Sequence, residues 1–352
     1  MKRRILCAVM ALIMCLGMIP VSAVSAVETG YTDVPEKHWA AESIRRATEL
    51  GVFNGVSGNT FGLGQSINRA AFVTALVRLF GWETVESEKA TFTDVVKGKW
   101  YYEAVETAVK NGAVVASGKT FRPTDPLTRG DMASMIMRAL GYTSLAGTVS
   151  GYESPFTDVT TNKGFITMAY DMGIVGGVGN SKFDPNGTAT REQAAAILVR
   201  VYDKLTAKNE KLTVAGPAPQ ITIKTPEVVE GSELPATPLE PIGDLYAALR
   251  EMKESGEDMS RVVLRLTAGG VRTTQSKQGR ILSVDTITAG QVRDILARNG
   301  VRTYYSERYE SAYCVHEPNG YQTVTIWYQS EESLAVKLQL GRMFGVTKYS
   351  LE

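Results

Sequence analysis

Three arginines stand at equivalent positions along the chain, each at the expected start of a helix. They are Arg69, Arg129 and Arg191, and they lie 60 and 62 residues apart. A helix start favours an anion, because its backbone N–H groups lack partners within the helix and the helix dipole is positive there. Arginine adds a fork of donors that matches a carboxylate or a phosphate. These positions therefore predict receptors for an acidic group, or alternatively pairs between each Arg and an Asp of a neighbouring unit.

Capping residues precede these arginines. Thr128 and Thr190 stand directly before Arg129 and Arg191, where a hydroxyl oxygen can accept from free backbone N–H groups. Gln193 follows Thr190 by three residues, which is the spacing of a capping box. The pattern predicts that the helices begin at the arginines.

Tryptophan and aspartate recur ahead of these helices. Trp39 and Trp100 each follow a recurring Asp by six residues. A Trp ring can pack on the apolar face of a sugar, but we favour the interpretation that both lie in the core under a helix start. The recurring acids are Asp33, Asp94 and Asp158, and we expect them to act as caps or turn formers ahead of the first helix of each unit.

All of these residues belong to a unit that occurs three times. Each unit opens with an aromatic residue and Thr-Asp-Val, continues through an amphipathic helix and a Gly-containing stretch, and ends in the helix that begins at the Arg. One such unit rarely buries its own apolar face, so three units are expected to share a core. We expect mostly helical repeats at residues 30–85, 91–145 and 155–206.

The spaced motifs together resemble the S-layer homology (SLH) domain, and three copies match its usual triplet. The resemblance implies three helix-pair repeats around a shared central bundle, in a three-pronged arrangement. It also implies non-covalent binding to a secondary cell-wall polysaccharide of a Gram-positive-type envelope. In this family a pyruvate ketal on an amino sugar is a frequent ligand, and its carboxylate would lie near the Thr-Arg helix start.

The motif positions differ between the repeats. The first repeat has Asn68 in place of Thr and Ala71 in place of an acidic residue, so Arg69 is a partial match, and the third has Phe165 near the expected Trp. We rank the second repeat first, because it keeps both the Trp and the Thr-Arg pair. The candidate polysaccharide-binding residues are Arg129, Thr128, Trp100, Arg191, Thr190, Arg69, Trp39, Asp33, Asp94 and Asp158.

The N-terminal residues are typical of a secretory signal. Three basic residues precede an apolar stretch at 5–19, and small residues follow at the spacing of a cleavage site, so we expect residues 1–26 to be removed. Removal leaves 35 basic and 37 acidic residues, a balance of −2 that does not attract nucleic acid. The expected location is the cell wall, with no transmembrane segment after cleavage and with Cys314 as the one remaining cysteine.

A Pro-rich segment at 207–241 separates the repeats from the rest of the chain. Its composition predicts an extended spacer that holds the following domain away from the polysaccharide. A short ordered strand near 221–223 is the alternative that we favour less.

Residues 242–352 are expected to form a small α+β domain and carry no motif that we assign to a family. Seven aromatic residues between 304 and 328 line either a binding surface or the core, and we favour the core. The pattern predicts helices at 242–253 and 288–299, and strands at 261–266, 280–284, 301–305, 312–316 and 321–328.

The C-terminal part has little material for catalysis. Cys314 and His316 could share one face of a strand as a thiol–imidazole pair, but a half-buried Cys and a surface His is the interpretation that we favour. We find no zinc motif and no phosphate loop, so we expect no cofactor and no catalytic residue. A displayed module that binds another envelope protein or a glycan is the first hypothesis. The alternative is a wall-anchored enzyme that acts on glycan or peptide through residues 242–352.

Overall fold

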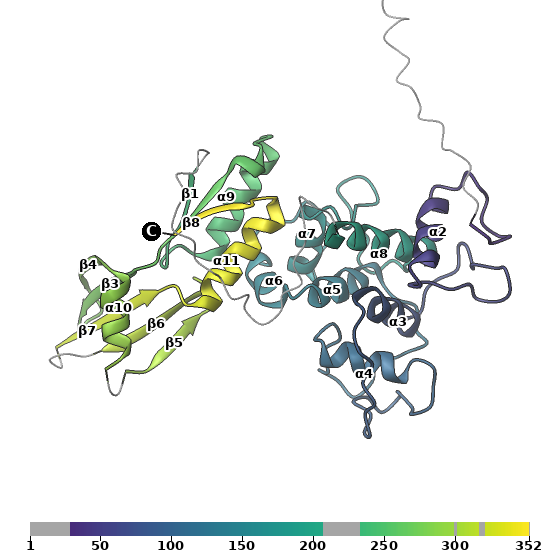
Figure 1. Ribbon diagram of the computed structural model, residues 1–352, viewed down its shortest axis with the longest axis horizontal. Coiled ribbons are helices and arrows are strands. Elements are labelled where there is room, and N and C mark those ends of the chain that lie inside the picture. The colour runs from purple at the N-terminus through teal and green to yellow at the C-terminus, as the bar shows by residue number, and fades with distance from the viewer. Residues whose placement is uncertain (1–28, 207–232, 299–300, 317–320, 352) are drawn as a thin grey trace, which may run out of the picture.

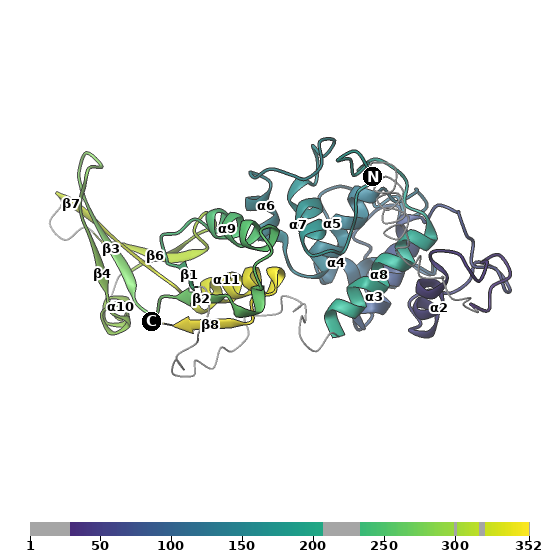
Figure 2. The ribbon, with the colours of Figure 1, turned by 90° about the horizontal axis from the view of Figure 1, so that it is seen from above.

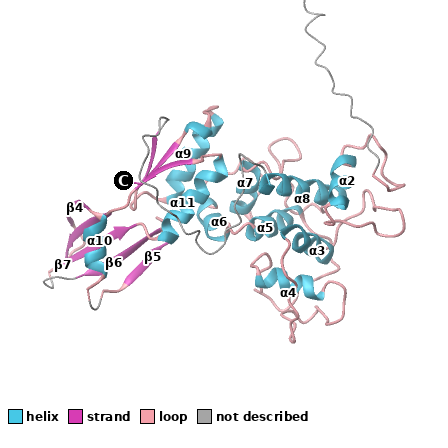
Figure 3. Ribbon diagram, in the orientation of Figure 1, coloured by secondary structure: helices cyan, strands magenta, loops and turns pink. Residues whose placement is uncertain are grey.

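The computed structural model describes residues 29–206, 233–298, 301–316 and 321–351 (Figure 1). The predicted signal segment and most of the predicted spacer lie outside the described residues. Figure 3 shows a helical N-terminal part followed by a part that mixes helices and strands. In these described ranges, no helix combines the length and the apolar character that a membrane crossing requires.

Each repeat contributes two helices, as predicted. The first helix of each repeat packs on the second helix of another repeat: α4 packs on α3, and α7 packs on α5. The ring closes between the first and third repeats, where α2 packs on α8. A short helix that the sequence does not predict, α6 (Thr143–Val149), packs on α7. The first helices are α2 (Ala41–Glu49), α4 (Tyr102–Lys110) and α7 (Lys163–Asp171), and the second helices are α3 (Arg69–Phe80), α5 (Arg129–Ala139) and α8 (Arg191–Thr206).

A closed triangle of backbone hydrogen bonds joins the three repeats just before their second helices. The N–H of Ile67 donates to the carbonyl of Ala189 (3.0 Å), the N–H of Leu127 donates to Ile67 (2.9 Å), and the N–H of Ala189 donates to Leu127 (2.9 Å). All three side chains are buried. Each repeat therefore bonds both of the others at the centre of the bundle.

The described residues of the C-terminal part form two sheets. The first is parallel, with the order β1-β2-β8, and the second is antiparallel, with the order β4-β3-β7-β6-β5. The helix α10 (Ala289–Leu296) covers one face of the second sheet, where its Val292 meets Ile287, Cys314 and Ile326. The strands are β1 (Glu233–Ala236), β2 (Val263–Leu266), β8 (Lys348–Leu351), β3 (Gly270–Ser276), β4 (Ile281–Ile287), β5 (Thr303–Ser306), β6 (Ser311–His316) and β7 (Gln322–Tyr328), and the other helices are α9 (Ile242–Glu254), α11 (Glu331–Phe344) and the short 3₁₀ helix Met259–Arg261.

A buried lysine joins the two sheets. The Nζ of Lys337, on α11, donates to the carbonyl of Thr237 beyond β1 (2.9 Å) and to the Oγ of Ser311 on β6 (3.2 Å). Lys337 is fully buried, and this burial lowers its pKa to about 8. These bonds fix the base of the antiparallel sheet to the parallel one.

The α+β class of the C-terminal part is as predicted, although several elements were not. The helix α9 and the strands β2, β4, β5, β6 and β7 lie at or near their predicted places, and α10 begins after the cap Thr288. The sequence patterns do not predict β3, α11 or β8. The strand β1 lies inside the range expected as spacer, where it pairs in parallel with β2.

The C-terminal part packs directly on the third repeat, so the expected separation by the spacer is wrong (Figure 2). The hydroxyl of Tyr246, on α9, donates to the carboxylate of Asp171 at the end of α7. Arg250 lies 3.7 Å from the same carboxylate and donates to the carbonyl of Glu153 (2.9 Å). The side chain of Asp171 is 5% exposed, so this junction excludes most water.

Candidate anion-binding boundaries between the repeats

The three recurring aspartates lie in turns ahead of the first helices, as predicted, but their carboxylates bind a distant loop rather than cap those helices. The carboxylate of Asp33 accepts from the backbone N–H groups of Phe61 (2.7 Å), Gly62 (2.7 Å) and Leu63 (2.9 Å). Each acid therefore places the loop that follows the Gly-containing stretch of its own repeat. Asp94 binds Phe121 and Arg122 in the same way, and Asp158 binds Phe183 and Asp184.

These bonds predict that the repeats lose stability in acid. Burial raises the pKa of Asp33, but its backbone donors outweigh that effect and lower the pKa below its usual value. The N–H of Phe183 is the main cause of the lowered pKa of Asp158. A depressed pKa contributes stability above about pH 4, the pKa of an unfolded Asp, and that stability is lost as the pH falls further. The thermal midpoint should therefore fall from pH 5 to pH 3, and Asp33→Asn should flatten this dependence; an unchanged slope in the variant would contradict it.

The loop carbonyls placed in this way accept from the arginine of the preceding repeat. The Nε of Arg129 donates to the carbonyl of Phe183 (2.9 Å), and its Nη2 donates to Gly176 (2.9 Å). The guanidinium also lies over the Phe183 ring, 4.6 Å from its centroid. Arg191 makes the equivalent bonds to Phe61 and Asn54 of the first repeat. Each boundary is thus built from the Arg of one repeat and the loop of the next.

The boundary at Arg69 differs in charge from the other two. Arg69 donates to the carbonyl of Phe121 (2.9 Å) and forms an ion pair with Asp131 of the second repeat. This is the alternative that pairs an Arg with an Asp of a neighbouring unit. Across the described residues, no carboxylate lies within ion-pair distance of Arg129 or Arg191. Burial lowers the pKa of both arginines, although a guanidinium stays charged at neutral pH.

The caps of the second helices are as predicted, but the free N–H groups expected beside the arginines are not available. The Oγ1 of Thr128 accepts from Asp131, and Thr190 and Gln193 form the expected capping box. The backbone N–H of Arg129 donates to Gly187 (2.8 Å), and those of the other two arginines donate to the neighbouring repeat as well. An anion at these boundaries must therefore be recognised by side chains.

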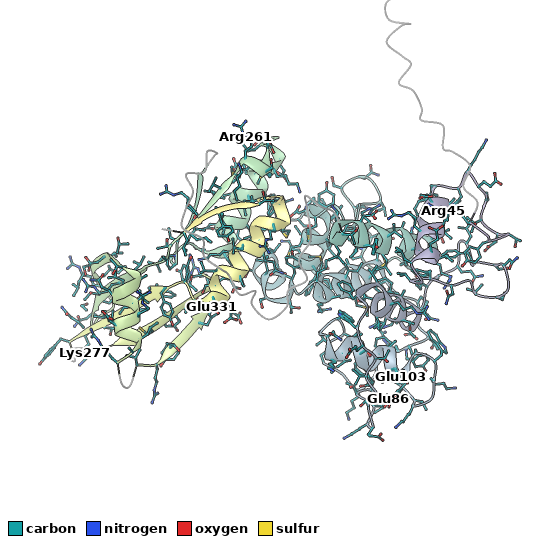
Figure 4. The ribbon with its side chains drawn as sticks, viewed as in Figure 1. Arg45, Glu86, Glu103, Arg261, Lys277 and Glu331 are labelled. Atoms are coloured by element: carbon teal, nitrogen blue, oxygen red, sulfur yellow. The ribbon has the colours of Figure 1, made fainter. Side chains whose placement is uncertain are left out.

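Trp39 and Trp100 are 61% and 65% exposed, so the favoured interpretation of both as core residues is wrong. In the second repeat the following residues, Tyr101 and Tyr102, fill the core instead. Trp100 lines an open cleft of about 450 Å³ together with Glu86 and Glu103. Figure 4 shows these two glutamates close together at the outer end of the second repeat. Arg129 is not among the residues that line this cleft, so the Trp and the Arg of one repeat serve different surfaces.

Each repeat carries a second arginine that the sequence analysis does not single out. A cleft of about 260 Å³ opens beside Arg69, and Arg138 lines it. The guanidinium of Arg138 lies 4.4 Å from the centroid of the Phe165 ring, and its buried Nε has no hydrogen-bond partner in the described part of the chain. The signal was present, because Arg78, Arg138 and Arg200 each follow a repeat arginine by nine residues.

The structure also shows where most of the candidate residues of the C-terminal part lie. Cys314 is buried, and burial raises the pKa of its thiol, which disfavours the thiolate that a nucleophile needs. The side chain of His316 lies outside the described part. Among the aromatic residues, Tyr304 stacks on Tyr313, which stacks on Trp327. Tyr304 is exposed, as is Tyr321, so the preference for the core is wrong for these two.

Comparison with known proteins identifies the family of the repeats. A family model described as "S-layer homology domain" matches residues 30–73, 91–133 and 155–195. An amylopullulanase of Thermoanaerobacterium thermosulfurigenes is 29% identical over 49% of this chain and 10% of its own length. An exoglucanase of Acetivibrio thermocellus is 30% identical over 49% of this chain and 16% of its own length, and an S-layer protein of Bacillus thuringiensis is 26% identical over 56% and 24%.

The chain spans about a tenth to a quarter of the length of these relatives. Among solved structures, the spore cortex-lytic enzyme SleL of Bacillus megaterium matches 32% of this chain and 26% of its own, with 18% identity and a TM-score of 0.27. The three family matches fall on the three repeats that the hydrogen-bonded triangle joins. The chain therefore carries three S-layer homology domains.

Proposed function

We propose that the three domains anchor this protein non-covalently to an acidic secondary cell-wall polysaccharide of a Gram-positive-type envelope. The ligand is a sugar with a carboxylate, such as a pyruvate ketal, and it binds at the boundaries between repeats. The C-terminal part is then a module displayed at the wall, free to meet another envelope protein or a glycan.

One observation carries this proposal. Arg129 and Arg191 are half-buried cations whose bonds go to neutral carbonyl groups. A positive charge that is held in place and lacks a carboxylate partner attracts an anion more strongly than one already paired, as Arg69 is with Asp131. The ranking of the second repeat above the first follows from this difference. Two boundaries on one glycan chain would add avidity without new contacts.

Replacing Arg129 should weaken attachment far more than replacing Arg69. Arg129→Gln should reduce binding to purified wall polysaccharide at least about tenfold, since a hydrogen bond to a charged group is worth roughly 1.5–3 kcal/mol. Arg69→Gln is the matched control, because it also removes a bond to a Phe carbonyl but leaves the two unpaired cations in place. Co-sedimentation at several salt concentrations measures the effect, and thermal midpoints verify that both variants fold.

Two results would reject the proposal. Equal losses in the two variants would remove the role of unpaired charge. Undiminished binding after mild acid treatment that removes the pyruvate ketals would show that the recognised group is not this carboxylate.

A wall-anchored enzyme remains the second hypothesis for the C-terminal part. The curated relatives include glycosidases by name, but their matches span about half of this chain. The buried Cys314 is poorly suited as its nucleophile. The displayed module therefore stays our first hypothesis, and the turnover of purified walls by the full chain discriminates between the two.

A further inference from the structure

One edge of the five-stranded sheet is free and apolar. The strand β4 hydrogen-bonds β3 along one side, and in the described part of the chain the sheet ends there. Three of its side chains, Ile281, Leu282 and Val284, are 58%, 49% and 57% exposed. A free edge strand presents unpaired backbone N–H and C=O groups to any strand that can approach it. These features together make β4 a surface for strand pairing.

The usual safeguards against such pairing are weak along β4. Protein edges are commonly blunted by lysine, proline or a very short strand, whereas β4 has seven residues and neither of those types. The pairing of β4 with β3 has a bulge at Leu282. The bulge lies near the β3–β4 turn, which carries Lys277 at the outer end of the sheet (Figure 4). Beyond the bulge, the pairing is regular from Ser283 to Ile287. Five consecutive residues therefore offer an undistorted edge.

The charge on β4 is directed onto its own sheet. Asp285 is the one charged residue of the strand. Its carboxylate accepts from the Nη2 of Arg272 on β3 (3.1 Å) and from the Oγ of Ser283 (3.2 Å). An approaching strand therefore meets a compensated carboxylate rather than an isolated negative charge.

The sequence of β4 is complementary to itself in the antiparallel direction. When Val284 lies opposite Val284 of a second copy, Ser283 lies opposite Asp285, so a hydroxyl donor faces a carboxylate in both halves of the pair. Leu282, the bulge residue, stands opposite Thr286 at either end, so the undistorted pairing spans Ser283 to Asp285 and no like charges stand opposite each other. A two-fold axis through the valine pair gives the closed symmetry that most homodimers have.

We propose that β4 is a self-association edge, through which two copies of this chain pair antiparallel about Val284 and join their five-stranded sheets. The interaction is independent of polysaccharide binding, because it uses a different part of the chain. It would couple neighbouring molecules once the repeats hold them at one surface, where the local concentration is high.

Sedimentation velocity of the full chain over a hundredfold range of concentration tests this proposal. We expect a concentration-dependent shift from monomer to dimer, and Val284→Lys should remove it by placing two ammonium groups opposite each other at the axis. Val315→Lys is the matched control, since Val315 is also exposed but lies on the inner strand β6. Circular dichroism and the thermal midpoint check that each variant folds.

Each outcome decides the proposal. Loss of the dimer in Val284→Lys and its retention in Val315→Lys support the edge. A wild-type chain that stays monomeric at every concentration overturns the second copy as occupant. A dimer that survives Val284→Lys but not Val315→Lys overturns the edge in favour of the sheet face.

Discussion

Replacing Asp33 by alanine should lower the free energy of unfolding by about 3 kcal/mol, because the substitution leaves three loop N–H groups without an acceptor. The carboxylate binds Phe61, Gly62 and Leu63 at 2.7–2.9 Å. The loop that it holds also supplies the carbonyl that positions Arg191 of the third repeat. We therefore expect the variant to lose both stability and part of its polysaccharide binding.

Urea unfolding followed by circular dichroism measures this stability effect. Glu36→Ala is a suitable control, since Glu36 is an exposed acid three residues away. Asp33→Asn should have a smaller effect than Asp33→Ala, because the amide oxygen can still accept. A loss below about 1 kcal/mol for the alanine variant would show that water replaces the carboxylate at little cost and that the loop does not depend on it.

Replacing Asp171 by alanine should release the C-terminal part from the third repeat. The substitution removes the acceptor of the Tyr246 hydroxyl and one of the two carboxylates near Arg250, which keeps its pair with Glu254. Leaving a buried donor without its acceptor typically costs about 1–3 kcal/mol. We expect a single unfolding transition in the wild-type chain to split into two, and proteases to cut between the two parts.

Two further variants make this experiment specific. Asp203→Ala breaks the exposed pair of Asp203 with Arg46, and such surface pairs contribute less than about 1 kcal/mol. Asp171→Asn should keep the parts docked, because burial already raises the pKa of this carboxyl and an amide can accept from Tyr246 without that penalty. Scanning calorimetry that shows one transition in Asp171→Ala would contradict the role of this junction.

The repeats were predictable from the sequence because their signals are local and recur. A capping threonine followed by an arginine marks the start of the second helix in the second and third repeats. In the first repeat, Asn68 caps the corresponding helix in the same way. What the sequence could not place was the partner of each arginine. That partner is a backbone carbonyl some 50 to 140 residues away in the chain, and carbonyl groups leave no signature in a residue pattern.

The predictions for the exposed tryptophans and for several C-terminal elements were wrong for different reasons. Trp100 was expected in the core under the helix start, but the next two residues, Tyr101 and Tyr102, are buried there instead. The strand β3 has the sequence Gly-Val-Arg-Thr-Thr-Gln-Ser, which lacks apolar alternation, so its place in the sheet comes from its pairing with β4 and β7. The strand β1 follows a Pro-rich segment and gains its order from pairing with β2, a contact between distant residues.

The triangle of Ile67, Leu127 and Ala189 limits how this anchor can change in evolution. Each repeat both gives one bond to a neighbour and takes one from the other, so the ring has no vacant place for a fourth member. Deleting a single copy would leave a donor and an acceptor stranded in the middle of the bundle. We therefore expect the three copies to be retained together as one unit, while the loops at each boundary can vary without breaking the ring.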